Sequence, residues 1–114
     1  MMQIFTNNNQ YIHLEIADAF LKRFLGLMGR KELPMGHGLL LAPCSSIHMM
    51  FMRFPLDVVY IDKSYTILKV VKNLQPWTGF SLCLSRQCWG VIELPAGSAD
   101  KYDLQVGTQL KTSS

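Results

Sequence analysis

The stretch that decides the fold is SIHMMFMRFPLDVVYID, residues 46–62, most of which are aliphatic, aromatic or methionine. Aromatic and β-branched residues favour strands. Pro55 has no backbone N–H to donate, so it has to lie at a strand end, edge or bulge. The stretch therefore predicts two strands, 46–54 and 56–61, joined at Pro55. Since both faces of the first strand would carry large apolar side chains, we expect both faces to be covered.

Strand patterns recur on both sides of this stretch. Strict alternation over residues 11–16 predicts a half-buried strand, and residues 3–5 precede it across an asparagine turn at 7–9. Residues 17–30 carry apolar side chains at helical spacing, with Asp18 as N-cap and Gly29 at the end. A short helix capped by Ser98 is expected near the C-terminus. The remaining expected strands are 39–42, 66–71, 88–94 and 106–110.

This order of elements predicts the fold class. Many short strands, one long helix and no alternation of strands with helices favour a mainly β fold. We expect a small single-domain β-barrel or sandwich spanning residues 1–114, with one N-terminal helix and a short C-terminal helix. A chain of 114 residues is long enough to bury a core without a metal or a disulfide.

Composition narrows the class of protein. Hydrophobic residues make up 49% of the chain and charged residues 17%, as in ordinary globular domains. Basic residues are spread out in runs of two at most, so we expect no nucleic-acid partner. We find neither a signal-peptide pattern nor an apolar run of the roughly 20 residues that cross a bilayer. We therefore expect no membrane contact and a cytoplasmic location, where an odd number of cysteines predicts reduced thiols.

Three polar side chains, His48, Arg53 and Asp57, stand out within the apolar stretch. A carboxylate in an apolar strand needs a partner, and the local candidates for Asp57 are Arg53 and His48. His48 has three interpretations: a metal ligand, a general base acting with Asp57 or Glu93, or a histidine hydrogen-bonded in the core. A metal site would need more ligands at a recognised spacing, so we predict no metal and no cofactor.

Two further candidates lie outside this stretch. Glu93, in VIELPAG, is either a catalytic group or part of a buried salt bridge to Arg23 or Arg30. Trp77 follows a proline in an irregular segment and is a candidate for a binding surface. The chain has no glycine-rich phosphate loop and no GxSxG nucleophile elbow.

Several motifs together resemble a known family. RFLGLMGR at 23–30, IHMMFMRFPLDVVYID at 47–62 and VIELPAG at 91–97 are similar, in this order, to the bacterial and archaeal domain of unknown function 192. The resemblance covers about residues 12–110. It implies a compact β-barrel or sandwich with a helix near the N-terminus, and it supplies no activity. Met49 stands where the family usually has threonine, which removes a hydroxyl beside His48. The polar residues of the family pattern are Arg23, Arg30, His48, Asp57 and Glu93, which would form a pocket or a buried ionic network.

These residues support three hypotheses. The first is a non-enzymatic small-ligand-binding or accessory domain with a polar cleft around His48, Arg53 and Asp57. The second is an acid/base enzyme, a hydrolase or isomerase, that uses His48 and Asp57. The third is a structural protein that pairs with a protein partner or a second copy through the predicted strand 47–54. The ligand-binding residues of the first hypothesis are Arg23, Arg30, His48, Arg53, Asp57 and Trp77.

Overall fold

The computed structural model describes residues 2–6, 8–17, 27 and 30–113. Seven strands form one sheet in the order β6-β5-β8-β3-β2-β1-β9, and β4 with β7 forms a separate two-stranded ribbon. The single helix of the described ranges is short. The elements are β1 Met2–Phe5, β2 Tyr11–Ala17, β3 His37–Leu41, β4 Ser46–His48, β5 Leu56–Ile61, β6 Ile67–Leu74, β7 Phe80–Leu82, β8 Gly90–Pro95, α2 Ser98–Lys101 and β9 Lys111–Ser113.

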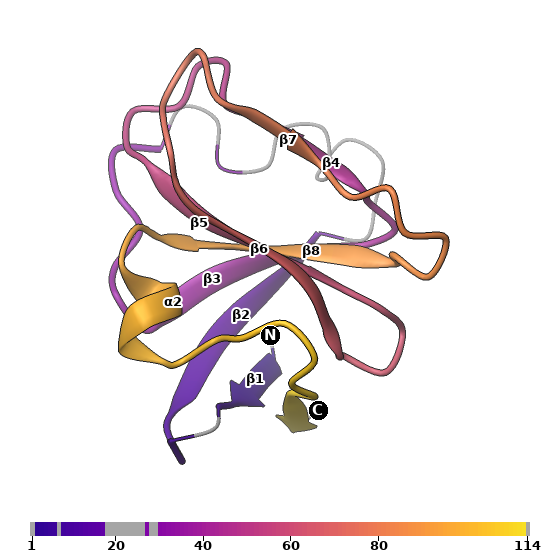
Figure 1. Cartoon of the computed structure of the whole chain (residues 1–114). Coiled ribbons are helices and arrows are strands. Elements are labelled where there is room, and N and C mark those ends of the chain that lie inside the picture. The colour runs from indigo at the N-terminus through magenta and orange to yellow at the C-terminus, as the bar shows by residue number, and fades with distance from the viewer. Residues whose placement is uncertain (1, 7, 18–26, 28–29, 114) are drawn as a thin grey trace.

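The seven-stranded sheet curls into a half-barrel (Figure 1). Its pairs are antiparallel except for β2 and β3, which run parallel. The segment just before β9 also bonds to the start of β6: Thr66 forms a bridge with Gln109, and the Ile67 N–H donates to the Thr108 carbonyl over 2.8 Å. The two outer strands of the sheet therefore approach one another through the C-terminal segment.

The central strands of the sheet are buried on both faces. Every residue of β5 and β8 is buried, and successive side chains alternate between two apolar clusters. Val59 and Ile61 belong to the cluster inside the half-barrel, whereas Val58 and Tyr60 belong to the cluster on the opposite face. Figure 1 shows α2 and the C-terminal segment on the first side and the β4–β7 ribbon on the second. Double burial explains why the side chains of β5, apart from Asp57, are aliphatic or aromatic.

The structure confirms a mainly β fold and the short C-terminal helix, with differences in detail. Gly97, at φ 96°, is the N-cap of α2, so the predicted cap by Ser98 is wrong. The Ser98 hydroxyl donates instead to the Pro95 carbonyl over 2.6 Å. The predicted N-terminal helix falls mostly on residues 18–26 and 28–29, outside the described residues. Within the described ranges, no helix has the length and apolar character needed to cross a membrane.

The predicted strands 46–54 and 106–110 differ most from the structure, whereas the others differ by at most three residues at their ends. The strand predicted over 46–54 ends at His48, because the chain turns there and Phe51 takes a left-handed backbone conformation, φ 64°. The strand predicted over 106–110 is instead a turn followed by one bridge, and β9 begins at Lys111. Gly107, at φ 92°, provides that turn with a conformation that favours glycine.

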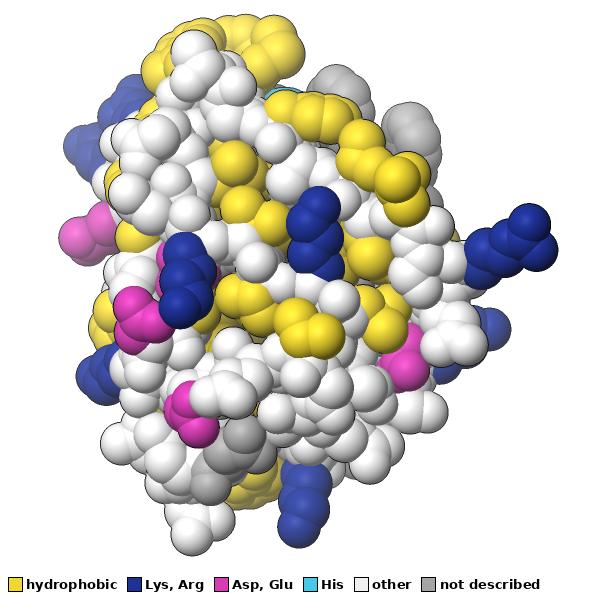
Figure 2. Space-filling view, viewed as in Figure 1, with side chains coloured by type: hydrophobic (Ala, Val, Ile, Leu, Met, Phe, Trp, Pro, Cys, Tyr) yellow, Lys and Arg dark blue, Asp and Glu magenta, His cyan; other side chains and the backbone are white. Residues whose placement is uncertain are grey.

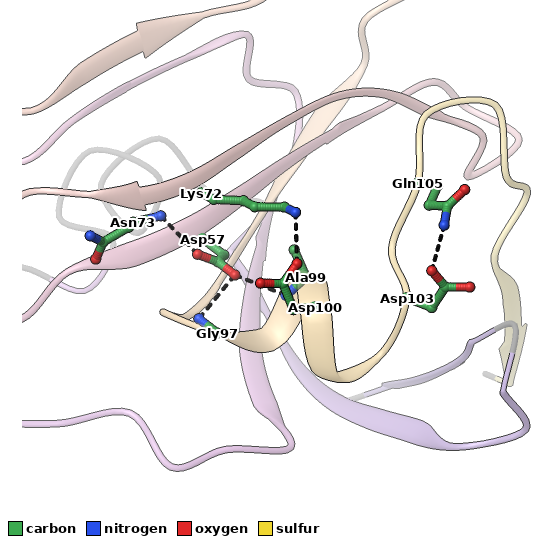
Figure 3. A network of polar contacts seen from close by, with 8 residues as sticks. All are labelled: Asp57, Lys72, Asn73, Gly97, Ala99, Asp100, Asp103 and Gln105. Carbon is green, nitrogen blue, oxygen red and sulfur yellow. Dashed lines mark hydrogen bonds and ion pairs between the residues drawn. The ribbon is translucent and has the colours of Figure 1, made fainter.

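The Asp57 carboxylate joins three parts of the fold (Figure 3). Its Oδ1 accepts the N–H of Asn73, at the end of β6, over 2.9 Å. Its Oδ2 accepts the N–H groups of Gly97 and Ala99, at the start of α2, over 3.1 and 2.8 Å. Asp57 is fully buried, and Asn73 has a left-handed φ of 57°. One side chain of β5 thus fixes both the end of β6 and the start of α2.

We predict that Asp57→Asn lowers the free energy of unfolding by about 2–3 kcal/mol, because hydrogen bonds to a charged acceptor are worth about that much and an amide cannot accept all three. Urea unfolding at neutral pH measures this change. The matched control is Asp103→Asn, an exposed position with φ 52° that asparagine tolerates. Equal losses in the two variants would contradict the structural role of Asp57.

Candidate functional site

The sheet separates the polar residues that were expected to form one cleft. The Asp57 carboxylate faces the inside of the half-barrel and is occupied by three backbone N–H groups. His48 ends β4, in register with Phe80 of β7, in the ribbon on the opposite face. His48 and Arg53 are both exposed. The predicted pairing of Asp57 with Arg53 or His48 is therefore wrong, and the predicted His48–Asp57 dyad is not formed.

His48 and Arg53 flank, in sequence, an exposed apolar surface at one end of the ribbon, and Trp77 is part of that surface. We call its four large side chains the aromatic platform: Met50, Phe51, Trp77 and Phe80. Their exposed fractions are 51%, 53%, 56% and 60%, respectively. The Phe51 and Trp77 rings meet edge to face, with centroids 5.0 Å apart. Figure 2 shows hydrophobic side chains gathered at the top of the molecule, over the loops next to the ribbon in Figure 1.

The backbone is left-handed at the two aromatic residues that the platform loops carry, Phe51 and Trp77. Phe51 has φ 64° and Trp77 has φ 68°. Bulky residues rarely adopt this conformation, which costs of order 1–3 kcal/mol each and is concentrated at functional sites. Two large exposed rings at strained positions contribute less to stability than smaller, more tolerant residues could.

Backbone hydrogen bonds lock the two loops together. The Trp77 N–H donates to the Met49 carbonyl over 2.6 Å, and the Met49 N–H donates to the Gly79 carbonyl over 2.9 Å. The Met49 side chain is fully buried beneath the platform loops. A Cβ at Gly79 would collide with the Gln75 carbonyl oxygen and lie 2.8 Å from Met49 Cγ, so only glycine allows this approach. The platform is thus preorganised on a packed base.

Glu93 is the most unusual titratable group in the described part of the chain. It lies in β8, in register with Leu39 of β3 and Val58 of β5, which belong to the apolar cluster beneath the ribbon. Its Oε1 is buried and has no hydrogen-bond partner. Burial raises the pKa of Glu93 to about 8, although the positive charge of Arg30 opposes the rise. Glu93 is therefore largely protonated and neutral at neutral pH.

The predicted salt bridge between Glu93 and Arg30 is not formed. Arg30 Nη2 lies 2.8 Å from Glu15 Oε2 and forms a partly exposed ion pair with it. Glu15 lies in β2, which β3 separates from the strand of Glu93, β8. The hydrogen bond from Arg30 holds the pKa of Glu15 below its usual value. Arg23, the other predicted partner, lies outside the described residues. No sequence spacing links Glu15 to Arg30.

Cys88 is shielded from nucleophilic chemistry by burial. Cys44, Cys83 and Cys88 are thiols rather than disulfides. Burial, together with a hydrogen bond to the Cys83 thiol, raises the pKa of Cys88 to about 12. The thiolate is the reactive form, so Cys88 is a poor nucleophile at neutral pH. In the described ranges no three His, Cys, Asp or Glu side chains are grouped as metal ligands.

Comparison with known proteins places the chain among uncharacterised relatives. The sequence profile of DUF192, described as "Uncharacterized ACR", matches residues 2–112. A UPF0127 protein of Pyrococcus furiosus is 28% identical over 97% of this chain and 96% of its own length. One from Pyrococcus abyssi is 32% identical over 86% of this chain and 84% of its own. A crystal structure of a protein of unknown function from Novosphingobium aromaticivorans matches with a TM-score of 0.85 at 18% identity, covering 96% of this chain and 82% of that one.

The raised pKa of Glu93 predicts a pH-dependent stability. The unfolded chain loses this proton near the ordinary pKa of 4.5 and the folded chain near 8. Stability contributed by Glu93 is therefore complete below pH 4.5, falls as the pH rises through this window, and is lost above pH 8. At about 1.4 kcal/mol for each pKa unit, the loss is on the order of 4–5 kcal/mol. Denaturant unfolding of Glu93→Gln and of the native sequence at several pH values measures the difference.

We expect Glu93→Gln to gain stability relative to the native sequence between pH 4.5 and 8, because glutamine carries no charge to bury. The matched control is Glu32→Gln at an exposed position, which should follow the native profile. Parallel stability profiles for Glu93→Gln and the native sequence would show that Glu93 is ionised in the fold.

Proposed function

The chain belongs to the DUF192 family, whose profile spans nearly all of it, and on that premise we propose that it is a non-enzymatic accessory domain that binds a protein partner through the aromatic platform. The observation that carries the proposal is the strained, exposed pair Phe51 and Trp77. His48, Arg53 and Trp77 of the predicted ligand set lie at this surface, whereas Asp57 does not contribute to it.

The platform has the features of an interaction centre. Aromatic residues, methionine and arginine are enriched in protein interfaces, and hot spots are rigid aromatic anchors in preorganised positions. Contiguous exposed apolar side chains on a small domain mark a contact site more often than isolated ones. The hydrogen-bonded base at Met49 and Gly79 holds the rings in place before a partner arrives. Little ordering entropy would then be lost on binding.

The charge around the platform favours an acidic partner. No aspartate or glutamate occurs between Glu32 and Asp57, or between Asp62 and Glu93. These two segments build the ribbon and its loops. Arg53 follows Phe51 by two residues, and the Lys69 ammonium donates to the Leu82 carbonyl at the end of β7 over 2.7 Å. A partner segment that combines acidic with aromatic or aliphatic side chains would match both the charge and the apolar surface. A second copy of this chain would instead bring like charges together.

The catalytic and cellular expectations from the sequence are also proposals. An acid/base enzyme would need a different arrangement from His48 with Asp57, since the Asp57 carboxylate is fully engaged. Glu93, neutral at physiological pH, is the remaining acid among the predicted catalytic candidates. We also propose a cytoplasmic location, which the reduced thiols support. We propose that the curled sheet serves as the rigid scaffold for the binding loops.

A displayed library of random peptides, selected on the whole chain, tests the proposed function. We expect the selected peptides to combine acidic with aromatic or aliphatic residues. The double variant Phe51→Ser/Trp77→Ser should bind them about 30-fold more weakly, equivalent to about 2 kcal/mol. Arg53→Gln should weaken binding less, and most strongly at low salt.

The matched control is Leu84→Ser/Val106→Ser, which removes two apolar side chains that are more exposed than any platform residue. This control should leave peptide affinity unchanged. A library that yields no binder, or peptides that bind the Phe51→Ser/Trp77→Ser variant as tightly as the native chain, would overturn the proposal. Binding of RNA or anionic vesicles at the platform, without peptide binding, would overturn the assignment of a protein partner.

A further inference from the structure

A recess lies away from the platform, beside the turn between β5 and β6. Its volume is about 430 Å³, within the range of small-ligand sites. Three separate parts of the chain line it: Pro43, the turn 62–64, and residues 86–89 before β8. We call this recess the Trp89 groove. Its lining residues are Pro43, Asp62, Lys63, Ser64, Arg86, Gln87, Cys88 and Trp89.

Backbone hydrogen bonds fix the walls of the Trp89 groove. The Trp89 N–H donates to the Ile61 carbonyl over 2.9 Å, and the Trp89 carbonyl accepts the Cys44 N–H over 3.0 Å. The Trp89 indole also meets the Tyr65 ring edge to face, with centroids 5.8 Å apart. The turn opposite is closed by the Tyr65 N–H donating to the Asp62 carbonyl over 3.0 Å. The groove is therefore a formed recess between anchored segments.

The charged groups of the groove favour an anion. Lys63 and Arg86 both line it, and neither takes part in an ion pair within the described residues. The one acidic residue, Asp62, uses its Oδ1 to accept the N–H groups of Ser64 and Thr66 over 2.8 and 2.9 Å. Cys88 adds no negative charge, because its pKa is raised to about 12. Two cations thus face the groove against one carboxylate that the turn already engages.

We propose that the Trp89 groove binds a small organic anion with a flat apolar body, its carboxylate or phosphate held by Lys63 and Arg86 and its body against the Trp89 indole. Arginine and lysine both recognise carboxylates and phosphates, arginine through a planar fork. A flat body replaces water over an aromatic surface that is already fixed in place. This site is separate from the aromatic platform, and its occupation does not depend on the proposed protein partner.

NMR titration of the ¹⁵N-labelled chain tests this inference, with four probes that separate the two parts of the ligand. Benzoate and phenyl phosphate carry a ring and an anionic group, inorganic phosphate carries the charge alone, and benzyl alcohol carries the ring alone. We expect saturable shifts of the Trp89 indole N–H with the first two probes. Inorganic phosphate and benzyl alcohol should bind at least about tenfold more weakly, since each lacks half of the contacts. The tighter of benzoate and phenyl phosphate identifies the anionic group.

Lys63→Gln and Arg86→Gln should each weaken the better probe about tenfold, as expected for one charge-assisted contact. The side chains of Lys63 and Arg86 are both exposed, so the fold should survive either substitution. Arg53→Gln is the matched control and should have no effect. Phe51→Ser/Trp77→Ser should also bind the probe normally, which separates this test from the platform. The inference is overturned if no probe saturates, if benzyl alcohol binds as well as benzoate, or if Arg53→Gln weakens binding as much as Arg86→Gln.

Discussion

The arrangement of the half-barrel depends on the hydrogen bonds that the Asp57 carboxylate accepts. Strands β5 and β8 are buried on both faces, so a charged carboxylate in them needs hydrogen-bond donors from inside the protein. Asp57 meets this requirement by accepting three backbone N–H groups, from the end of β6 and the start of α2. It thereby holds α2 against the open side of the curled sheet. The opposite face is left for the ribbon and its loops.

The two faces of the sheet also differ in features that bear on stability. The inner face carries one of the two apolar clusters and the Asp57 network, both of which stabilise the fold. The outer face carries features that cost stability: the unpartnered Glu93 Oε1 and the left-handed backbone at Phe51 and Trp77. Local departures from the most stable choice concentrate where a protein meets other molecules. The aromatic platform, on the outer face, is where we place the proposed contact with a partner.

The sequence predicted the strands that burial determines, and failed where backbone conformation determines the structure. The run 56–61 was predicted correctly because residues buried on both faces have to be apolar. The run 46–54 has an equally strand-like composition, yet the strand ends at His48 because Phe51 turns the backbone. A phenylalanine in the sequence does not predict a positive φ, because bulky residues rarely adopt one. The turn is stabilised by hydrogen bonds of Met49 with Trp77 and Gly79, which are far from it in the sequence.

The positions of the candidate site residues were predicted only in part, because some of them depend on backbone groups and on turns. Trp77 was expected at a binding surface because it lies in a loop beside proline, and it is exposed there. The need of Asp57 for a partner was foreseen, but its partners are backbone groups, which a search among charged side chains cannot find. Phe51 was predicted to lie in a strand with both faces covered, whereas Phe80, which begins β7, lay in a segment predicted to be irregular. Only the three-dimensional structure shows that both side chains are exposed and that the Phe51 ring contacts Trp77.

The measurement that tests the central claim most directly is the free energy of unfolding of Phe51→Asn/Trp77→Asn compared with Phe51→Ala/Trp77→Ala. Both double variants remove the rings, but asparagine tolerates a left-handed backbone better than alanine does. If the rings serve binding at a cost in strain, the asparagine variant should lie within about 1 kcal/mol of the native chain and above the alanine variant by about 1–2 kcal/mol. Equal losses of several kcal/mol in both variants would contradict the account, because the rings would then be part of the core.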